Sequence, residues 1–447
     1  MRRAGLLAIS MMLTLGGCQC EDVRGASPWE LGVVEDGGVD TDIVETDTDQ
    51  PPETDVPEPD VCDEAPEFQI SYFELGMDQF QAPRVTRGTV YSQTNLREIV
   101  TVDSSDGSTD TVAEEGENRL RAAAGGKALV YRRAEFDEPF TPVIVDSDGS
   151  EEVIGDFSER LDRPRGVSWA GTGNPFDGSR FGVVLENDPN AAPGWIGYYD
   201  GSTSDEIHVG EWTRPPVSLT PDGLVFAGRT GPLSGGGNRE IFIYDPASAM
   251  GLRRLTNTQP YERNPTTAGS LVYWNTDRAV YRMSVDDRSP EVIHDGFCGP
   301  VDADGRRATF ICDSGGAPGD SPSSRGPRLG DELRYYDGER VRRVPTGRDY
   351  VTSPRVDGRS VVWFAYDNPT PFSGTRNTGE LRYWRVGMAE SVAIDEVGAP
   401  CLSCGAIWPP INLSADGGVI AWNYAVGDED RPTGSGGGVA TWVGGCE

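Results

Sequence analysis

One pattern of strand and turn residues recurs along most of this chain, and it limits the folds that the chain can adopt. Each copy begins with Pro or Arg-Pro in a short loop. A Gly-containing turn, a β-rich run ending in an aromatic residue, a variable loop and a second strand of alternating aromatic and aliphatic residues follow. Eight copies are recognised, with predicted strand pairs at residues 89–91 and 99–103, 128–131 and 142–146, 181–185 and 195–200, 224–226 and 240–245, 271–273 and 279–285, 308–311 and 332–337, 360–364 and 380–384, and 419–422 and 439–443.

The repeats predict an all-β fold, because no segment shows a long helical period. Four-stranded sheets of about this length, arranged as blades around a channel, form a β-propeller, in which neighbouring blades bury one another's apolar faces. A β-sandwich is the alternative, but its strands would not share one repeated sequence. We expect a propeller of eight blades, with seven as the alternative. Residues 68–73 precede the first copy and would supply the outer strand of the last blade.

Two segments carry a resemblance to a known repeat. Residues 238–245, Asn-Arg-Glu-Ile-Phe-Ile-Tyr-Asp, are followed by Arg-Arg-Leu-Thr-Asn at 253–257, and residues 353–363 form the second segment. They resemble the TolB-like, or WD40-like, propeller repeats of bacterial proteins, and the resemblance covers most of residues 67–443. It implies the fold and does not identify a function. TolB itself has a separate N-terminal α/β domain without a counterpart here, so its partnership with the peptidoglycan-associated lipoprotein is not carried over.

The N-terminus has the organisation of an export signal. Arg2 and Arg3 precede an apolar stretch at residues 4–15, which is too short to span a bilayer stably. The sequence Leu-Gly-Gly at 15–17 followed by Cys18 resembles the lipobox of bacterial lipoproteins, and the alternative is an ordinary secretory signal. The resemblance implies cleavage before Cys18 and a lipid on its thiol, which would attach the protein to a membrane of the cell envelope. Gln19, where some lipoproteins have Asp, favours the outer membrane; which of its faces is left open.

An acidic segment separates this signal from the repeats. Residues 21–61 contain 14 acidic residues and one arginine, a composition that predicts a disordered, self-repelling linker. Its Asp-x-Asp pairs lack the Gly turn and closing Glu of a calcium loop, so we assign no metal and leave calcium binding open. The predicted domains are therefore a signal peptide at 1–17, a lipid-anchored acidic linker at 18–61 and a β-propeller at 62–447.

The charge of the chain excludes one class of partner. A formal net charge of −33 repels the phosphates of nucleic acids. We therefore expect no nucleic acid partner. We expect a monomer that is held to the membrane through the lipid on Cys18 and that binds an unidentified protein or glycan.

The eight cysteines suggest disulfides, because export exposes them to oxidising conditions. Cys298 and Cys312 flank the first two strands of one copy. Cys62 and Cys446 lie at the two ends of the propeller, where a bridge would fasten the ring. Cys401 and Cys404 suggest a local disulfide, because no thioredoxin-like pattern surrounds them and no second Cys or His pair is available for zinc. Cys20 would then be left free.

Several short motifs suggest chemistry, but turns explain them better. Asp-Ser-Gly-Gly at 313–316 resembles the serine region of trypsin-like proteases, yet the chain has only two histidines and neither context matches that family. Asp-Ser-Asp-Gly at 146–149, Asp-Ala-Asp-Gly at 302–305 and Ser-Ala-Asp-Gly-Gly at 414–418 suit tight turns between strands. No catalytic residue and no cofactor is assigned.

Two functions remain. The first is a lipid-anchored binding or scaffold module, and the sequence favours it over an enzyme. The alternative is a polysaccharide lyase or hydrolase that uses carboxylates or arginines in the propeller funnel. An enzyme should gather ionisable side chains in the funnel, whereas a scaffold should show a plugged or bland channel and a broad exposed patch.

Overall fold

The computed structural model describes the repeat region of the chain in fifteen main segments. They are residues 66–74, 83–94, 96–114, 116–135, 140–155, 174–185, 195–208, 213–229, 238–248, 251–258 with 261–313, 331–367 with 378–398, and 413–424 with 436–443. The signal, the acidic linker and the cysteines at 18, 20, 62, 401, 404 and 446 lie outside these residues.

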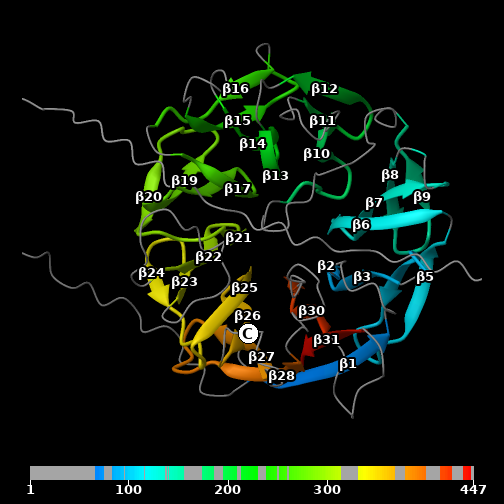
Figure 1. The fold of residues 1–447 in the computed structure, drawn as a ribbon, viewed down its shortest axis with the longest axis vertical. Coiled ribbons are helices and arrows are strands. Elements are labelled where there is room, and N and C mark those ends of the chain that lie inside the picture. Colours follow the sequence, from blue (N-terminus) through cyan, green and yellow to red (C-terminus); the bar gives the residue numbers. More distant parts are fainter. Residues whose placement is uncertain are drawn as a thin grey trace, which may run out of the picture. The chain divides into compact units, whose positions relative to one another are not determined.

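The described residues form eight antiparallel sheets arranged in a ring, which confirms the eight-bladed propeller (Figure 1). All named elements of this part of the chain are strands. Accordingly, it contains no helix of the length and hydropathy needed to cross a membrane. We number the blades in chain order, starting from the first complete sheet.

Blades 1 to 4 contain the following strands. Blade 1 has β2 (Arg84–Thr86), β3 (Thr89–Gln93), β4 (Ile99–Val102) and β5 (Thr109–Ala113). Blade 2 has β6 (Glu117–Ala124), β7 (Lys127–Arg133), β8 (Thr141–Asp146) and β9 (Glu151–Val153). Blade 3 has β10 (Phe181–Leu185), β11 (Trp195–Tyr199) and β12 (Ser204–His208). Blade 4 has β13 (Thr213–Thr220), β14 (Gly223–Arg229), β15 (Arg239–Tyr244) and β16 (Leu252–Arg254).

Blades 5 to 8 continue around the ring. Blade 5 has β17 (Arg263–Ala268), β18 (Leu271–Asn275), β19 (Ala279–Ser284) and β20 (Glu291–Asp295). Blade 6 has β21 (Asp302–Asp304), β22 (Arg307–Cys312), β23 (Glu332–Tyr336) and β24 (Val341–Arg343). Blade 7 has β25 (Tyr350–Asp357), β26 (Ser360–Tyr366), β27 (Thr378–Arg385) and β28 (Val392–Gly398). Blade 8 has β29 (Leu413–Asp416), β30 (Val419–Tyr424), β31 (Gly436–Trp442) and β1 (Phe68–Glu74).

Blade 8 is built from distant parts of the chain. Strand β1 pairs antiparallel with β31 over seven positions, from Phe68 opposite Trp442 to Glu74 opposite Gly436. In Figure 1 the blue β1 accordingly lies beside the red β31. This confirms the prediction that residues 68–73 supply the outer strand of the last blade.

Glycines in β31 make room for aromatic rings in blade 8. A Cβ on Gly437 would lie 2.3 Å from the Phe73 ring, and one on Gly438 would lie 2.3 Å from the Trp422 ring. Both distances are far below van der Waals contact. A stretch that resembles a flexible linker in the sequence therefore forms a strand, because large rings from the neighbouring strands fill the space.

The core lies between blades as well as within them. Trp274, Trp363 and Trp422 are all fully buried. One apolar cluster joins Phe73 and Val439 of blade 8 to Val85 and Val90 of blade 1. A single blade could not bury these faces, so each blade depends on its neighbours.

Short polar contacts join the inner strands of successive blades. Asp302 Oδ2 of blade 6 accepts a hydrogen bond from the Val356 N–H of blade 7 at 2.8 Å. Asp304 Oδ2 accepts one from the Gly358 N–H at 2.7 Å. In both contacts a side-chain oxygen of one blade satisfies a backbone N–H of the next, a group that would otherwise be left without a partner.

The same arrangement recurs at other joints. Further contacts of this kind are Asp357 with Gly418 N–H (2.9 Å), Ser414 with Val85 N–H (3.0 Å), Asp416 with Arg87 N–H (2.5 Å), Thr86 with Gly126 N–H (3.2 Å) and Ser218 with Thr267 N–H (3.1 Å). We call these seven contacts the interblade latches. One contact of the opposite sense accompanies them, from the Asn174 N–H of blade 3 to Ser218 Oγ of blade 4.

Candidate functional site

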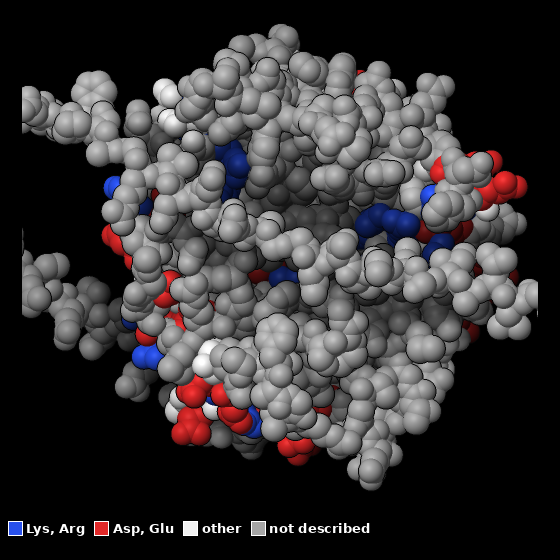
Figure 2. Space-filling view, viewed as in Figure 1, with Lys and Arg blue, Asp and Glu red and all other residues white. Residues whose placement is uncertain are grey.

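The propeller has an open central cavity of about 450 Å³, a volume typical of small-molecule sites. Its wall contains residues of the inner strands β2, β6, β13, β17, β21, β25 and β29, together with Asn174 and Pro175 of blade 3. All eight blades therefore contribute. Figure 2 shows the hollow at the centre of one face, with basic side chains at its sides and most of the visible acidic side chains nearer the outer edge.

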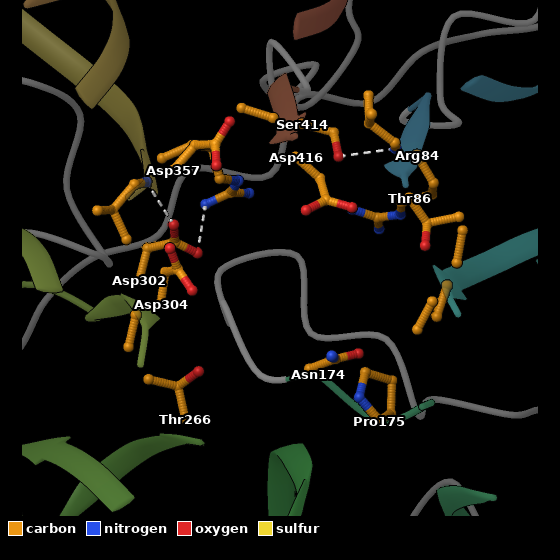
Figure 3. Close-up of a pocket in the computed structure, with 18 of the residues that line it drawn as sticks. Arg84, Thr86, Asn174, Pro175, Thr266, Asp302, Asp304, Asp357, Ser414 and Asp416 are labelled. Carbon is orange, nitrogen blue, oxygen red and sulfur yellow. Dashed lines mark hydrogen bonds and ion pairs between the residues drawn. The ribbon is translucent and has the colours of Figure 1, made fainter. Parts of the chain in front are cut away.

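Four aspartates, Asp302, Asp304, Asp357 and Asp416, form the acidic side of the cavity and come from blades 6, 7 and 8 (Figure 3). Each uses one oxygen in an interblade latch. Burial raises the pKa of the Asp302 carboxyl, although Arg355 opposes this shift. Burial also raises the pKa of Asp357, and the charges of Asp416 and Asp304 add to that effect. The aspartates therefore hold the ring together and give the cavity a concentrated negative side.

Arginines line other parts of the same cavity. Arg84 lies on β2 of blade 1, Arg121 on β6 of blade 2 and Arg355 on β25 of blade 7. Arg355 is well satisfied, since its Nε donates to the Leu413 carbonyl at 2.9 Å and its Nη1 lies 3.8 Å from Asp302 Oδ1. Neither Arg84 nor Arg121 has an ion-pair partner among the described residues, and the Nε of each is buried without an acceptor there.

The pKa values of these two arginines reflect the absence of a paired carboxylate. Burial lowers the pKa of Arg84 to about 10, and the positive charges of Arg355 and Arg121 contribute. Burial likewise lowers the pKa of Arg121 to about 10; Tyr131, whose ring centre lies 5.1 Å from the Arg121 guanidinium carbon, opposes this shift, and the charge of Arg119 adds to it. Both remain cationic at neutral pH. The cavity therefore has cationic side chains without ion-pair partners among the described residues on blades 1 and 2 and acidic side chains on blades 6, 7 and 8, of which blade 8 adjoins blade 1.

A second cavity, of about 400 Å³, lies between blades 7 and 8. Arg385 lies with its guanidinium carbon 5.0 Å from the Trp442 ring centre, a cation–π contact. Asp357 and Ala415 line both this cavity and the central one. The two cavities therefore adjoin at two channel residues.

A buried pair of glutamates lies outside both cavities, near the joint between blades 4 and 5. Glu240 and Glu262 are 2% and 1% exposed. Thr256 Oγ1 donates to both carboxylates, and Glu262 also accepts from the Ile241 N–H at 3.0 Å. Burial raises the pKa of Glu262 to about 7, and the Glu240 charge adds to the shift. The site therefore titrates near neutrality.

Of the predicted cysteine sites, the described residues include one. Cys298 and Cys312 form a disulfide in blade 6, where the two residues face each other across an isolated antiparallel bridge. His294 lies close enough to form a three-donor group with them, but both sulfurs are bonded to each other. The predicted sites at Cys18, Cys62, Cys446, Cys401 and Cys404 lie outside the described residues.

Of the short segments that resemble catalytic or calcium-binding motifs, those that the structure describes lie at turns, and some of them also line the channel. Residues 146–149 form the turn between β8 and β9, where the Gly149 N–H donates to the Asp146 carbonyl. Residues 302–305 and 414–418 do lead into turns, as predicted, but their aspartates also line the channel. Sequence reasoning missed that second role and missed Arg84 and Arg121. The available signal was the recurrence of Asp or Ser two residues apart before a Gly turn.

Comparison with known proteins finds similarity of fold alone. No family model and no curated protein matches the sequence. Solved structures that resemble the chain include a prolyl endopeptidase (14% identity, 69% of this chain, 46% of that one, TM-score 0.45) and the propeller domain of the Trilobed protease from Pyrococcus furiosus (14%, 71%, 97%, 0.44). TolB from Acinetobacter baumannii is also similar (12%, 72%, 79%, 0.35). The chain spans about half the length of the prolyl endopeptidase it matches.

Proposed function

We propose that this protein is a lipid-anchored binding module of the bacterial cell envelope and that its ligand, a protein segment or a glycan, enters the central cavity. The observation that carries this proposal is the presence of Arg84 and Arg121 without an ion-pair partner among the described residues, in an open cavity that four aspartates also line. A scaffold that used only its outer surface would not need such a cavity, because uncompensated buried charge costs stability.

The architecture suits recognition by a rigid site. The charged residues lie on short inner strands whose positions are set by the interblade latches. Side chains held on strands within a packed ring keep their geometry better than side chains on loops. A ligand would therefore meet an arrangement that is already formed, which reduces the entropy lost on binding.

Envelope attachment is the second part of the proposal. The lipobox-like sequence before Cys18 and the acidic segment at 18–61 support a lipid anchor with a charged spacer, on the outer membrane. The test is incorporation of radiolabelled palmitate into the wild type and into Cys18→Ala. We expect label in the wild type and its loss in the variant. Equal labelling would contradict lipidation at this residue.

Blocking the cavity tests the binding role. Asn174 is an exposed residue of the cavity wall, so Asn174→Trp should fill part of the cavity with little change to the core. We expect at least tenfold weaker binding of soluble peptidoglycan fragments or lipopolysaccharide core oligosaccharides to the full chain, measured by calorimetry. Val292→Trp, on the exposed outer strand of blade 5, is the matched control and should bind like the wild type. Absence of binding by the wild type, or equal binding by both variants, would contradict the proposal.

The alternative function is a polysaccharide-active enzyme, and the raised pKa values of Asp302 and Asp357 favour it. A carboxyl with a raised pKa is suited to general acid catalysis. The same two residues are committed to latches, however, which explains their burial without chemistry. Release of reducing ends from the oligosaccharides by the wild type, with loss in Asp302→Asn, would support the enzyme instead.

A further inference from the structure

We infer that Arg84 and Arg121 form an oxyanion-binding site in the central cavity, which receives a carboxylate or phosphate group of the ligand. This inference rests on the proposal that the cavity binds a ligand, and it specifies the chemistry of that ligand. The two arginines come from adjacent blades and line the same cavity. The positive charges of Arg355 and Arg121 repel that of Arg84 and help to lower the pKa of Arg84.

Neighbouring carboxylates do not neutralise this pair. Arg355 pairs with Asp302 and donates to two carbonyl oxygens. On the other side, Arg119 pairs with Glu117 at 2.8 Å. Glu117 is also shared with Arg97 and Arg133, so this single carboxylate already serves three arginines.

The two arginines lack ion pairs within the described part of the chain, although acidic residues outnumber basic ones in the sequence. The chain has 72 acidic residues and 39 basic ones, yet none of the described acidic residues forms an ion pair with Arg84 or Arg121. The Nε–H groups of both are buried with no described acceptor. Buried donors of this kind usually have partners, because an unmade hydrogen bond of a charged group costs free energy. A bound oxyanion would supply the missing negative charge next to the guanidinium groups that line the cavity.

Guanidinium chemistry points to the class of ligand. A guanidinium offers several N–H donors in a planar fork, which matches the oxygens of a carboxylate or a phosphate. Because a halide has no such geometry, the site should distinguish oxyanions from chloride. Asp302, Asp304 and Asp357, which lie together at one side of the cavity in Figure 3, would repel a second negative group. The preferred ligand is therefore anionic at one end, with hydroxyl or amine donors facing Asp304 and Asp357.

The test measures thermal unfolding of the full chain in potassium phosphate, in potassium glucuronate and in potassium chloride at equal ionic strength. The wild type should unfold at a higher temperature in phosphate or glucuronate than in chloride, by mass action. Glucuronate and phosphate separate the two sources of the oxyanion. Arg84→Gln and Arg121→Gln should each weaken the binding of phosphate or glucuronate at least tenfold, as measured by calorimetry. Arg343→Gln, an exposed arginine on β24, is the matched control and should respond like the wild type.

A purely structural role for these arginines makes a different prediction. In chloride alone, Arg84→Gln should be at least as stable as the wild type, because removing one charge relieves repulsion. A structural role would instead destabilise the variant in all three salts. That result, or an undiminished oxyanion effect in both variants, would overturn the inference.

The inference and the proposed function fail in different ways. If phosphate and glucuronate have no effect while Asn174→Trp still abolishes oligosaccharide binding, the oxyanion site is wrong and binding in the cavity stands. If both oxyanions bind while Asn174→Trp leaves oligosaccharide binding unchanged, the oxyanion site stands and the proposed function is wrong.

Discussion

Replacing Phe73 by alanine should lower the free energy of unfolding by about 3–5 kcal/mol, the usual cost of emptying a buried aromatic site. Phe73 lies on the closing strand β1, is 3% exposed and packs with residues of blades 8 and 1. Gly437 opposite has no side chain with which to fill the space. The loss should therefore weaken both the strand pairing and the joint between the two blades.

The measurement is equilibrium denaturant unfolding of wild type and variant. Gln69→Ala is the matched control, because Gln69 lies on the same strand with its side chain exposed. It should change stability by less than about 1 kcal/mol, as surface hydrogen bonds do. Similar destabilisation by both variants would show that Phe73 does not close the ring through packing.

The second large effect concerns the buried Glu262. Its pKa is raised from 4.5 to about 7 in the folded chain, so the folded state keeps a proton that the unfolded state releases. Stability should consequently fall as the pH rises from 4.5 to 7, by roughly 3 kcal/mol in all, because each pH unit of difference is about 1.4 kcal/mol. Below pH 4.5 both states are protonated and this contribution vanishes.

Glu262→Gln should remove that dependence. We expect the variant to be up to about 3 kcal/mol more stable than the wild type at pH 8 and nearly equal to it at pH 4.5. Unfolding by urea across this range measures the difference, which isolates Glu262 from the other titrating groups. Glu339→Gln, at an exposed turn position, should leave the pH dependence unchanged. An unaltered slope in Glu262→Gln would contradict the assignment.

The two middle strands of every blade could be predicted from the sequence, because they are β-rich and apolar. The inner strands are harder to recognise. Strands β2 and β21 have only three residues each, and the second consists of Asp302, Ala303 and Asp304. A polar tripeptide before a Gly turn has no alternating apolar face, so local sequence indicates a turn rather than a strand. It forms a strand because its backbone pairs with β22, while its two aspartate side chains accept hydrogen bonds from backbone N–H groups of blade 7.

Strand β31 shows the opposite difficulty. Its first half, Gly436–Gly438, is expected to be flexible on propensity. The structure places rings from β1 and β30 over these glycines, a relation between segments far apart in the chain. The prediction of the closing strand succeeded because residues 68–73 are rich in aromatic and β-branched side chains, namely Phe68, Ile70, Tyr72 and Phe73, whereas the predicted last strand began at residue 439 and so left out the three glycines at the start of β31.

The arginines of the candidate site could not be predicted from any local sequence pattern. The chain has 39 basic residues, and nothing beside Arg84 or Arg121 distinguishes them from the others. They become significant only when inner strands from blades 1 and 2 are placed around one cavity. The aspartates of residues 302–304 and 416 were correctly associated with turns, but which way their side chains pointed required the position of the next blade.

The interblade latches have the same form on both sides of the point where the ring closes. Between blades 8 and 1, Ser414 and Asp416 accept from Val85 and Arg87, as Asp302 and Asp304 do from Val356 and Gly358 between blades 6 and 7. Blade 8, which β1 and β31 close by pairing between distant parts of the chain, is thus joined to blade 1 by the same kind of contact that joins blade 6 to blade 7. A blade duplicated at one of these joints would bring with it the acceptors and donors that its new neighbours need.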